Sequence, residues 1–337
     1  MTYGAYNKVM VQCQSDNLTR RHFIHSALIG GCAIATGCLG NPRSQGGRLE
    51  KVWGLRGSTP GRLFRPRAIA IDKSDLLYIV DMTPQIQVFT GDGVFLRGWQ
   101  TPEFEHGRPS GLAFDNAGNL LVCDTHYFRV LVFTPAGQML QEQTIGGKCG
   151  SGDGEFQFVT DAAQDSHGNY YVAQYGEYDR IQKFSADHKF ILSWGEHGRE
   201  LGQFLRPQKL VVDQSDFVWV TDACNHRVQI FDARGNEAKL VTAWGKQGNL
   251  PGELNYPYDI LLDDAALAGK SQGHVYLCEF GNHRVQKFTT EGRFVASFGH
   301  SGRRDGELDQ PWGIARDSQG RMFVLDTYNH RVQRFRL

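Results

Sequence analysis

The last stretch of the chain, GELDQPWGIARDSQGRMFVLDTYNHRVQRFRL at residues 306–337, contains the pattern that decides the fold. Three short runs in it, at 311–317, 322–326 and 331–335, alternate apolar with polar or small side chains. An Asp-x-x-Gly turn ends the first run, and the polar segment Thr-Tyr-Asn-His follows the second. Period-two alternation between turn signals predicts three β-strands.

The same pattern occurs six times, and the earlier copies begin at Phe64, Gly107, Gly154, Gly202 and Gly252. One phenylalanine anchors the third strand of each copy, and consecutive ones lie 44 to 57 residues apart: Phe89, Phe133, Phe184, Phe231, Phe288 and Phe335. Most copies add a fourth strand that ends in Trp-Gly or Phe-Gly. Periods of this length predict a six-bladed β-propeller, an all-β fold of four-stranded antiparallel blades.

The two ends of the repeat region are complementary. The last copy stops at Leu337 without a fourth strand, whereas residues 49–54, LEKVWG, form a fourth-strand pattern without a copy of their own. We therefore expect the N-terminal strand to complete the last blade and close the ring, which removes exposed sheet edges. The predicted organisation is a propeller at 48–337, preceded by a linker at 38–47.

Three copies contain an Asn-His-Arg triplet between their second and third strands, at residues 225–227, 282–284 and 329–331. Together with the repeats, these triplets resemble the NHL-repeat family, and the resemblance extends over 48–337. It implies a six-bladed β-propeller. It implies no single function, because propellers include enzymes, RNA binders and scaffolds.

The triplet histidines, His226, His283 and His330, are expected to be structural. Strands step outward by about 4.8 Å each, which places these loops too far from the ring axis to share a metal with ligand distances of about 2.1 Å. We expect each histidine and arginine to brace its own loop. Five copies end the second strand with an acid, namely Asp81, Asp124, Asp222, Glu279 and Asp326. These acids are placed to pair with the arginine that begins the third strand in most copies.

A better place for a site is the mouth of the central channel, where the first strands begin. The two residues after the proline of each copy, or after its equivalent, point into this mouth and vary from copy to copy, which leaves room for a ligand. The candidate ligand-binding residues are Arg67, Asp161, Gln208, Lys209, Tyr258, Asp259 and Trp312. Charged and aromatic groups around a concave pit suit a peptide, sugar or small polar ligand. A solvated rim, in which Lys209 pairs with Asp161 and Asp259, is the alternative.

The pattern of these positions disfavours one known reaction of the family. The amidating lyases that it contains carry zinc-binding histidines at the first of these positions, in Pro-His pairs. None of the six first positions here is histidine. We predict no catalytic residue, no metal and no cofactor. A propeller enzyme of the lyase or lactonase type, with a metal in the channel, is the alternative.

Residues 1–37 resemble a bacterial twin-arginine export signal. The pair Arg20-Arg21 precedes a weakly apolar, glycine-rich run that is too short for a spanning helix of about 20 residues. Cys38 follows small residues and is the candidate lipidation site, with Cys32 as the second. We expect an exported protein of the periplasm or cell envelope, whose only membrane contact is a lipid anchor. An uncleaved amphipathic N-terminus is the alternative.

The charge balance provides no overall attraction to nucleic acid, because 36 Lys and Arg stand against 36 Asp and Glu. We expect a monomeric, non-enzymatic binding or scaffold protein that presents its loop face and channel mouth to a protein, peptide or glycan partner. RNA binding, which animal NHL propellers perform, requires a basic face and a cytosolic location, and the export signal contradicts that location.

Two loops interrupt the repeat. Residues 264–272 are inserted between the first and second strands of the fifth copy, and we expect a short helical turn there, on the face away from the Asn-His-Arg loops. Residues 146–154 join the second and third copies. Their order does not fit a phosphate-binding loop, so we interpret them as a connector.

Overall fold

The computed structural model describes residues 47–336. The predicted export signal at 1–37, with Cys32 and Cys38, lies outside the described residues, as does the linker up to residue 46. Within 47–336, no helix is long and apolar enough to cross a membrane.

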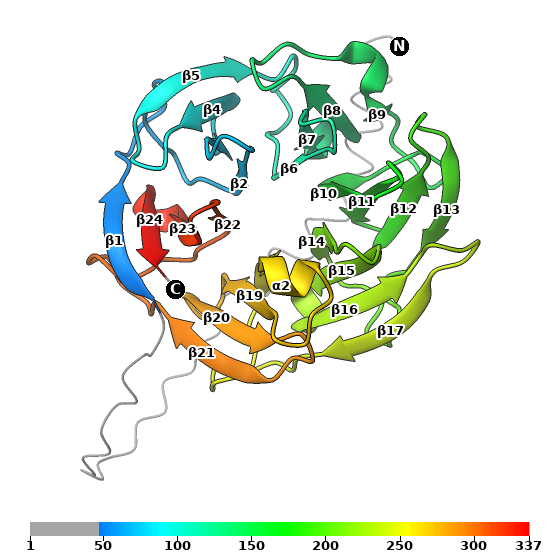
Figure 1. Cartoon of the computed structure of the whole chain (residues 1–337). Helices are drawn as coiled ribbons and strands as arrows, with labels where there is room; N and C mark the ends of the chain where they lie inside the picture. The colour runs from blue at the N-terminus through cyan, green and yellow to red at the C-terminus, as the bar shows by residue number, and fades with distance from the viewer. Residues whose placement is uncertain (1–46, 337) are drawn as a thin grey trace, which may run out of the picture. The chain divides into compact units, whose positions relative to one another are not determined.

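Six four-stranded antiparallel sheets stand around a central axis, as the sequence predicts (Figure 1). We number the blades 1 to 6 in chain order. Their innermost strands are β2 (Ala68–Ile71), β6 (Gly111–Phe114), β10 (Phe158–Gln164), β14 (Pro207–Val212), β18 (Pro257–Leu262) and β22 (Ile314–Arg316). The second strands are β3 (Leu77–Val80), β7 (Leu120–Asp124), β11 (Tyr170–Tyr175), β15 (Phe217–Asp222), β19 (His274–Glu279) and β23 (Arg321–Asp326).

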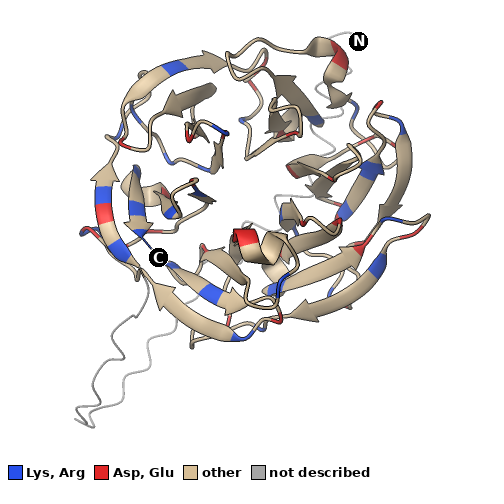
Figure 2. Ribbon diagram, viewed as in Figure 1, with Lys and Arg blue, Asp and Glu red and all other residues tan. Residues whose placement is uncertain are grey.

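The outer half of each blade is completed in the same way. The third strands are β4 (Gln85–Phe89), β8 (Arg129–Phe133), β12 (Arg180–Phe184), β16 (Arg227–Asp232), β20 (Arg284–Thr289) and β24 (Arg331–Arg336). The outermost strands are β5 (Phe95–Gln100), β9 (Ile145–Gly146), β13 (Phe190–Trp194), β17 (Lys239–Trp244), β21 (Phe294–Phe298) and β1 (Arg48–Trp53). Blade 2 has the shortest of these, and the 3-10 turn η3 (Gln141–Gln143) precedes it. Acidic and basic residues are interspersed around the ring rather than separated (Figure 2).

Ring closure follows the predicted route. The N-terminal strand β1 pairs antiparallel with β24, from Arg48 opposite Arg336 to Trp53 opposite Val332. Trp53 then joins blade 6 to blade 1, because its ring is buried and lies 5.2 Å from the ring of Phe89 in β4. The remaining core is built in the same way, from apolar clusters between adjacent blades.

Removing the closing tryptophan tests how much this junction stabilises the ring. Trp53→Ala is expected to lower the free energy of unfolding by about 3–5 kcal/mol, because it leaves a cavity between the first and last blades. Leu55→Ala, at a side chain that is 65% exposed, is the control and should change it by less than about 0.5 kcal/mol. Urea denaturation measures both. If both variants lose the same small amount of unfolding free energy, the packing of Trp53 between the first and last blades contributes little to stability.

A buried carboxylate at the end of the second strand organises each triplet blade. In blade 4, Asp222 accepts hydrogen bonds from Leu205 N at 2.8 Å, Asn225 Nδ2 at 2.9 Å, Arg227 Nε at 2.8 Å and Gln229 Nε2 at 3.1 Å. These donors come from the loop that enters the blade, from the triplet and from the third strand. One carboxylate therefore fixes three segments of the blade at once.

The predicted acid–arginine pairs are present in the four blades that contain both the acid and the arginine. They are Asp124–Arg129 at 3.0 Å, Asp222–Arg227 at 2.8 Å, Glu279–Arg284 at 2.7 Å and Asp326–Arg331 at 2.6 Å. In blade 1, Asp81 instead accepts from the backbone N and the hydroxyl of Thr83. In blade 3, the loop residue Asp179 supplies the acid and lies 2.7 Å from His197 Nδ1.

The prediction that each triplet histidine braces its own loop was wrong. His226 Nδ1 accepts from Tyr256 N at 3.1 Å, His283 Nδ1 from Gln310 N at 3.0 Å and His330 Nδ1 from Arg65 N at 3.1 Å, and all three donors belong to the next blade. Each histidine has a positive φ of 55° to 58°, a left-handed conformation that turns the chain sharply at this point. The histidines therefore connect blades. The arginines brace their own blade as predicted, and Arg227 donates to the carbonyls of the loop that enters blade 4.

A neutral replacement at the carboxylate tests its structural role. Asp222→Asn should lower the free energy of unfolding by at least about 2 kcal/mol, because it leaves the buried Arg227 without its charged partner. Asp232→Asn is the matched control. It removes a carboxylate from an exposed pair with Arg234 and should cost less than about 1 kcal/mol. Guanidinium denaturation of both variants would decide, and indistinguishable losses would contradict the assigned role.

Candidate functional site at the channel mouth and in the channel

The structure brings all seven predicted mouth residues to the ring axis, where they line one small space of about 10 Å³. They lie in two layers. Arg67, Gln208, Tyr258 and Trp312 occupy the first position of their blades and form the outer layer. Asp161, Lys209 and Asp259 are one residue further along and form the inner layer, called here the charged layer. The mouth is therefore filled by side chains rather than hollow.

Cation–aromatic contacts dominate the outer layer. The guanidinium of Arg67 lies 5.3 Å from the centre of the Trp312 ring. Arg206 lies 4.9 Å from the ring of Tyr175 and 5.1 Å from that of Tyr258, and its Nε donates to Gln208 Oε1 at 2.9 Å. Such contacts hold arginines without neutralising them. The name mouth cluster is used below for Arg67, Arg206, Tyr175, Tyr258 and Trp312.

Two members of the mouth cluster were not found from the sequence. Arg206 lies directly before Pro207, and its equivalents Arg65, Tyr256 and Gln310 also vary, so the criterion of variation between copies would have selected it. Tyr175 ends β11 in blade 3, which has residues 177–180 (Glu-Tyr-Asp-Arg) in place of an Asn-His-Arg triplet. Its approach to the axis has no signal in the sequence.

Neither arginine of the mouth cluster forms an ion pair with an acidic side chain in the part of the chain that the structure describes, although the charges of Asp179 and Asp81 act on Arg206 and Arg67, respectively. None of the ion pairs within 47–336 includes Arg67 or Arg206. Burial and the nearby charge of Arg206 both lower the pKa of Arg67. Two partly buried cations thus lie near each other at the end of the channel.

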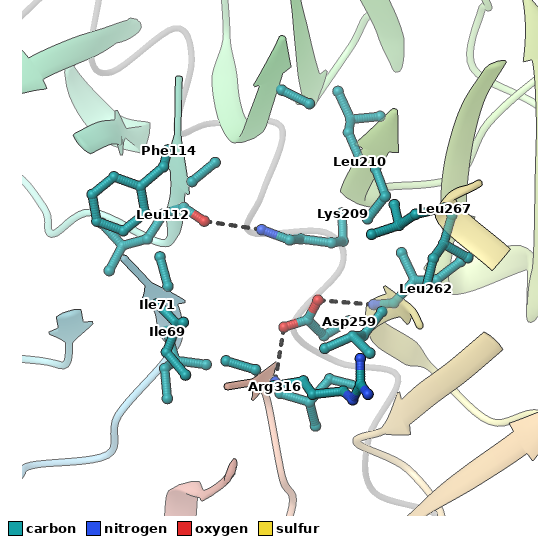
Figure 3. A pocket seen from close by; sticks show the side chains of 18 of the residues that line it. Ile69, Ile71, Leu112, Phe114, Lys209, Leu210, Asp259, Leu262, Leu267 and Arg316 are labelled. Carbon is teal, nitrogen blue, oxygen red and sulfur yellow. Dashed lines mark hydrogen bonds between the residues drawn. The ribbon is translucent and has the colours of Figure 1, made fainter. Parts of the chain in front are cut away.

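The charged layer closes the channel beneath the mouth. Lys209 Nζ donates to Asp161 Oδ1 at 3.0 Å. It also donates to the carbonyl of Leu112 at 3.0 Å and so reaches across to blade 2 (Figure 3). A Cβ on Gly111 would lie 2.1 Å from the carbonyl oxygen of Thr160, so only glycine fits beside this crossing. The ion pair between Lys209 and Asp161 that the sequence analysis offered as an alternative is therefore present.

Asp259 is held differently from Asp161. Its two oxygens accept from the backbone N of Ile260 at 2.8 Å and of Ile314 at 2.9 Å (Figure 3). Burial raises the pKa of Asp259 to about 7, with a further contribution from the charge of Asp161 and an opposing one from Lys209. Burial works against the ammonium group of Lys209, but the two carboxylates outweigh it and raise its pKa. Burial also raises the pKa of Asp161, against the opposing charge of Lys209. With its pKa of about 7, Asp259 changes charge near neutral pH.

A cavity of about 470 Å³, called here the channel pocket, lies on the other side of the charged layer. All six innermost strands line it, and its walls include Ile71, Leu112, Phe114 and Leu262 (Figure 3). The inserted segment forms the predicted short helix, α2 (Asp264–Leu267), and lies at the rim of this pocket. The variable residues of the sequence indicate a site at the mouth but not this larger space.

Potential metal ligands do not gather in the part of the chain that the structure describes. Within 47–336, no group of three or more His, Cys, Asp or Glu side chains is placed to hold one metal ion. The three triplet histidines are engaged between blades, as described above.

Comparison with known proteins agrees with the class of fold seen here, a six-bladed β-propeller. A family model described as NHL repeat matches residues 107–133, 204–231 and 308–335, which lie in blades 2, 4 and 6. The chain belongs to the NHL-repeat family.

Relatives of several kinds share this architecture. NHL repeat-containing protein 3 of Homo sapiens is 27% identical over an alignment of 281 residues. The match covers 68% of this chain and 81% of the relative. A probable peptidyl-alpha-hydroxyglycine alpha-amidating lyase of Caenorhabditis elegans is 27% identical over 169 residues, 48% of this chain and 43% of the relative, so the match spans less than half of that protein. An auxiliary nutrient binding protein of Bacteroides ovatus has a similar structure, with a TM-score of 0.62, 18% identity and coverage of 81% of this chain and 69% of that one. At that identity, the likeness shows the fold alone.

The titration of Asp259 can be read from stability measurements. Its folded-state pKa of about 7 exceeds the usual value of 3.8, so the folded state favours the protonated carboxyl, and this stabilising contribution is lost as pH rises from about 4 to 7. Between pH 5 and 8, the stability of the wild type relative to Asp259→Asn should fall by on the order of 2 kcal/mol. Asp187→Asn, at an exposed carboxyl whose pKa is lowered to about 2, is the control and should show no such trend. Urea denaturation across this pH range measures the free energy of unfolding of both proteins. If the wild type and Asp259→Asn show the same pH dependence, the raised pKa of Asp259 is contradicted.

Proposed function

We propose that this protein is a non-enzymatic binding propeller, which holds an anionic group of a protein, peptide or glycan partner at its channel mouth. The observation that carries the proposal is the pair Arg67 and Arg206, which stack on aromatic rings and form no ion pair with an acidic side chain within 47–336. A buried cation is costly unless it is paired. An incoming carboxylate or other anion would supply that pairing.

The surrounding rings add a second kind of recognition. Tyr258 stacks on Phe280 at 4.7 Å and lies 4.7 Å from Trp312, so the arginines are flanked by a continuous aromatic surface. Rigid aromatic rings beside arginines are typical of binding hot spots. The loops that surround the mouth would provide the remaining contacts with a larger partner.

Several further parts of this proposal rest on the sequence and on similarity. The paired arginines at 20–21 support export, and Cys38 supports a lipid anchor, with a monomer in the periplasm or cell envelope. The nutrient binding protein of Bacteroides ovatus shares this fold.

A propeller enzyme of the lyase or lactonase type with a channel metal is the second candidate, supported by the similarity to the Caenorhabditis elegans lyase. The first positions of the six blades are Arg67, Ser110, Thr160, Gln208, Tyr258 and Trp312. None is a histidine. Stoichiometric zinc or calcium that remained with the purified protein after dialysis would replace the binding proposal with this one.

Anionic recognition predicts a specific loss on removal of the mouth arginines. Purified protein should bind oligogalacturonate or a glutamate-rich peptide more tightly than the neutral methyl ester of the same probe, because only the anion pairs with the arginines. Arg67→Gln and Arg206→Gln should each weaken this binding by about tenfold or more, as expected for a charge-assisted contact of about 1.5–3 kcal/mol. Biolayer interferometry at two salt concentrations would measure both effects.

The controls separate mouth binding from general charge attraction. Arg293→Gln removes the same charge from an exposed pair with Glu291, in a hairpin turn far along the blade from the mouth, and should leave binding unchanged. Failure of the wild type to bind either anionic probe would overturn the proposal, as would undiminished binding by both mouth variants. Salt-sensitive retention of an RNA oligonucleotide in preference to these probes would support the RNA alternative instead.

A further inference from the structure

The channel pocket is a separate site from the mouth, because the charged layer lies between them. Its volume of about 470 Å³ falls within the range of small-molecule sites. Side chains of Ile69, Ile71, Leu112, Phe114, Leu210 and Leu262 give it largely apolar walls (Figure 3). The α2 insertion breaks the repeat at the rim, where Leu267 and Asp264 face the pocket. A ligand that filled this space would need an apolar body.

The charges at the inner end of the pocket are unbalanced. Two carboxylates, Asp161 and Asp259, stand beside one ammonium group, that of Lys209. Lys209 is already engaged by Asp161 and by the Leu112 carbonyl. Asp259 lines the pocket, is 5% exposed, and accepts only from backbone N–H groups. Within the described chain, no cationic side chain forms an ion pair with it.

The rim has no spare cation either. Arg316 lines the pocket but donates to Asp264 Oδ2 at 3.0 Å, so its charge is already paired. An anionic ligand would therefore meet a negative inner end and an occupied rim arginine. A cationic ligand would supply the charge that the inner end lacks.

We propose that the channel pocket binds a small cationic amphiphile, an aliphatic or aromatic body that carries a primary ammonium group, with the ammonium paired to Asp259. The apolar body would lie along the aliphatic walls and Phe114. The ammonium would also meet the free lone pairs of the Asp259 oxygens, each of which accepts one backbone hydrogen bond. This site is independent of anion binding at the mouth.

The charge of Asp259 makes binding depend on pH. The ionisable groups that face it are Asp161 from β10, Lys209 from β14 and the Cys278 thiol from β19, whose pKa burial raises well above its usual value. Asp161 is paired with Lys209 at 3.0 Å, and burial keeps the Cys278 thiol neutral, whereas the pKa of about 7 makes Asp259 change charge near neutral pH. Because an ammonium group pairs with the ionised form, affinity should rise roughly tenfold from pH 6 to pH 8.

The experiment uses three probes of one shape: 2-phenylethylamine, 2-phenylethanol and 3-phenylpropionate. Isothermal titration calorimetry on purified protein at pH 8 should show one site for the amine and at least tenfold weaker binding for the alcohol and the acid. Asp259→Asn should weaken amine binding by at least tenfold and remove its pH dependence. Asp187→Asn, the same chemical change at an exposed hairpin residue, should alter neither.

A second variant tests the channel pocket without changing any residue of the charged layer. Val212→Phe adds volume at a half-buried wall position and should weaken amine binding while leaving the pH dependence of what remains. A crystal soaked with 4-bromophenethylamine should give an anomalous bromine peak in the channel pocket. Equal affinities for the amine and the acid, binding that survives Asp259→Asn, or bromine bound only elsewhere would each overturn the proposal.

Discussion

The rest of the structure depends on a buried carboxylate that is hydrogen-bonded at the end of a second strand. In blade 4, Asp222 binds the entering loop, the triplet and the third strand together, and Glu279 and Asp326 do the same in blades 5 and 6. A buried charge is tolerated only when it is satisfied. The constraint fixes the loops at one end of each blade, and those loops surround the channel mouth.

The triplet histidines connect neighbouring blades, whereas the buried carboxylates connect segments within one blade. Because His226, His283 and His330 accept from the backbone of the following blade, the same triplet that fixes one loop also positions the next. These repeated side chains therefore position the loops that lead into the innermost strands of blades 5, 6 and 1. The identity of the residues where the innermost strands begin is left free, and it is there that the chain places two arginines and a set of aromatic rings.

The sequence determined the fold well because one pattern was repeated six times, so weak strand signals reinforced one another. It also identified which residues meet at the axis, since position relative to the proline at the start of each copy is enough to place Arg67, Lys209 and Trp312 there. It did not separate the mouth from the charged layer, because a shift of one residue along a strand changes the depth of a side chain. The contacts of the histidines depended on a left-handed backbone conformation, and the channel pocket depended on the combined volume of side chains from six strands. Neither is visible in a linear pattern.

The pairing of β1 with β24 also affects the order in which the propeller can fold during synthesis. The ribosome makes β1 first among these strands, but β1 finds its partner only when β24, the last of them in the sequence, has been made. During synthesis, five blades can form locally, but the ring stays open with two unpaired edges. Contacts this distant in sequence form slowly. Completion of the propeller therefore waits for β24, and loss of that strand would expose the edges of β1 and β23 together.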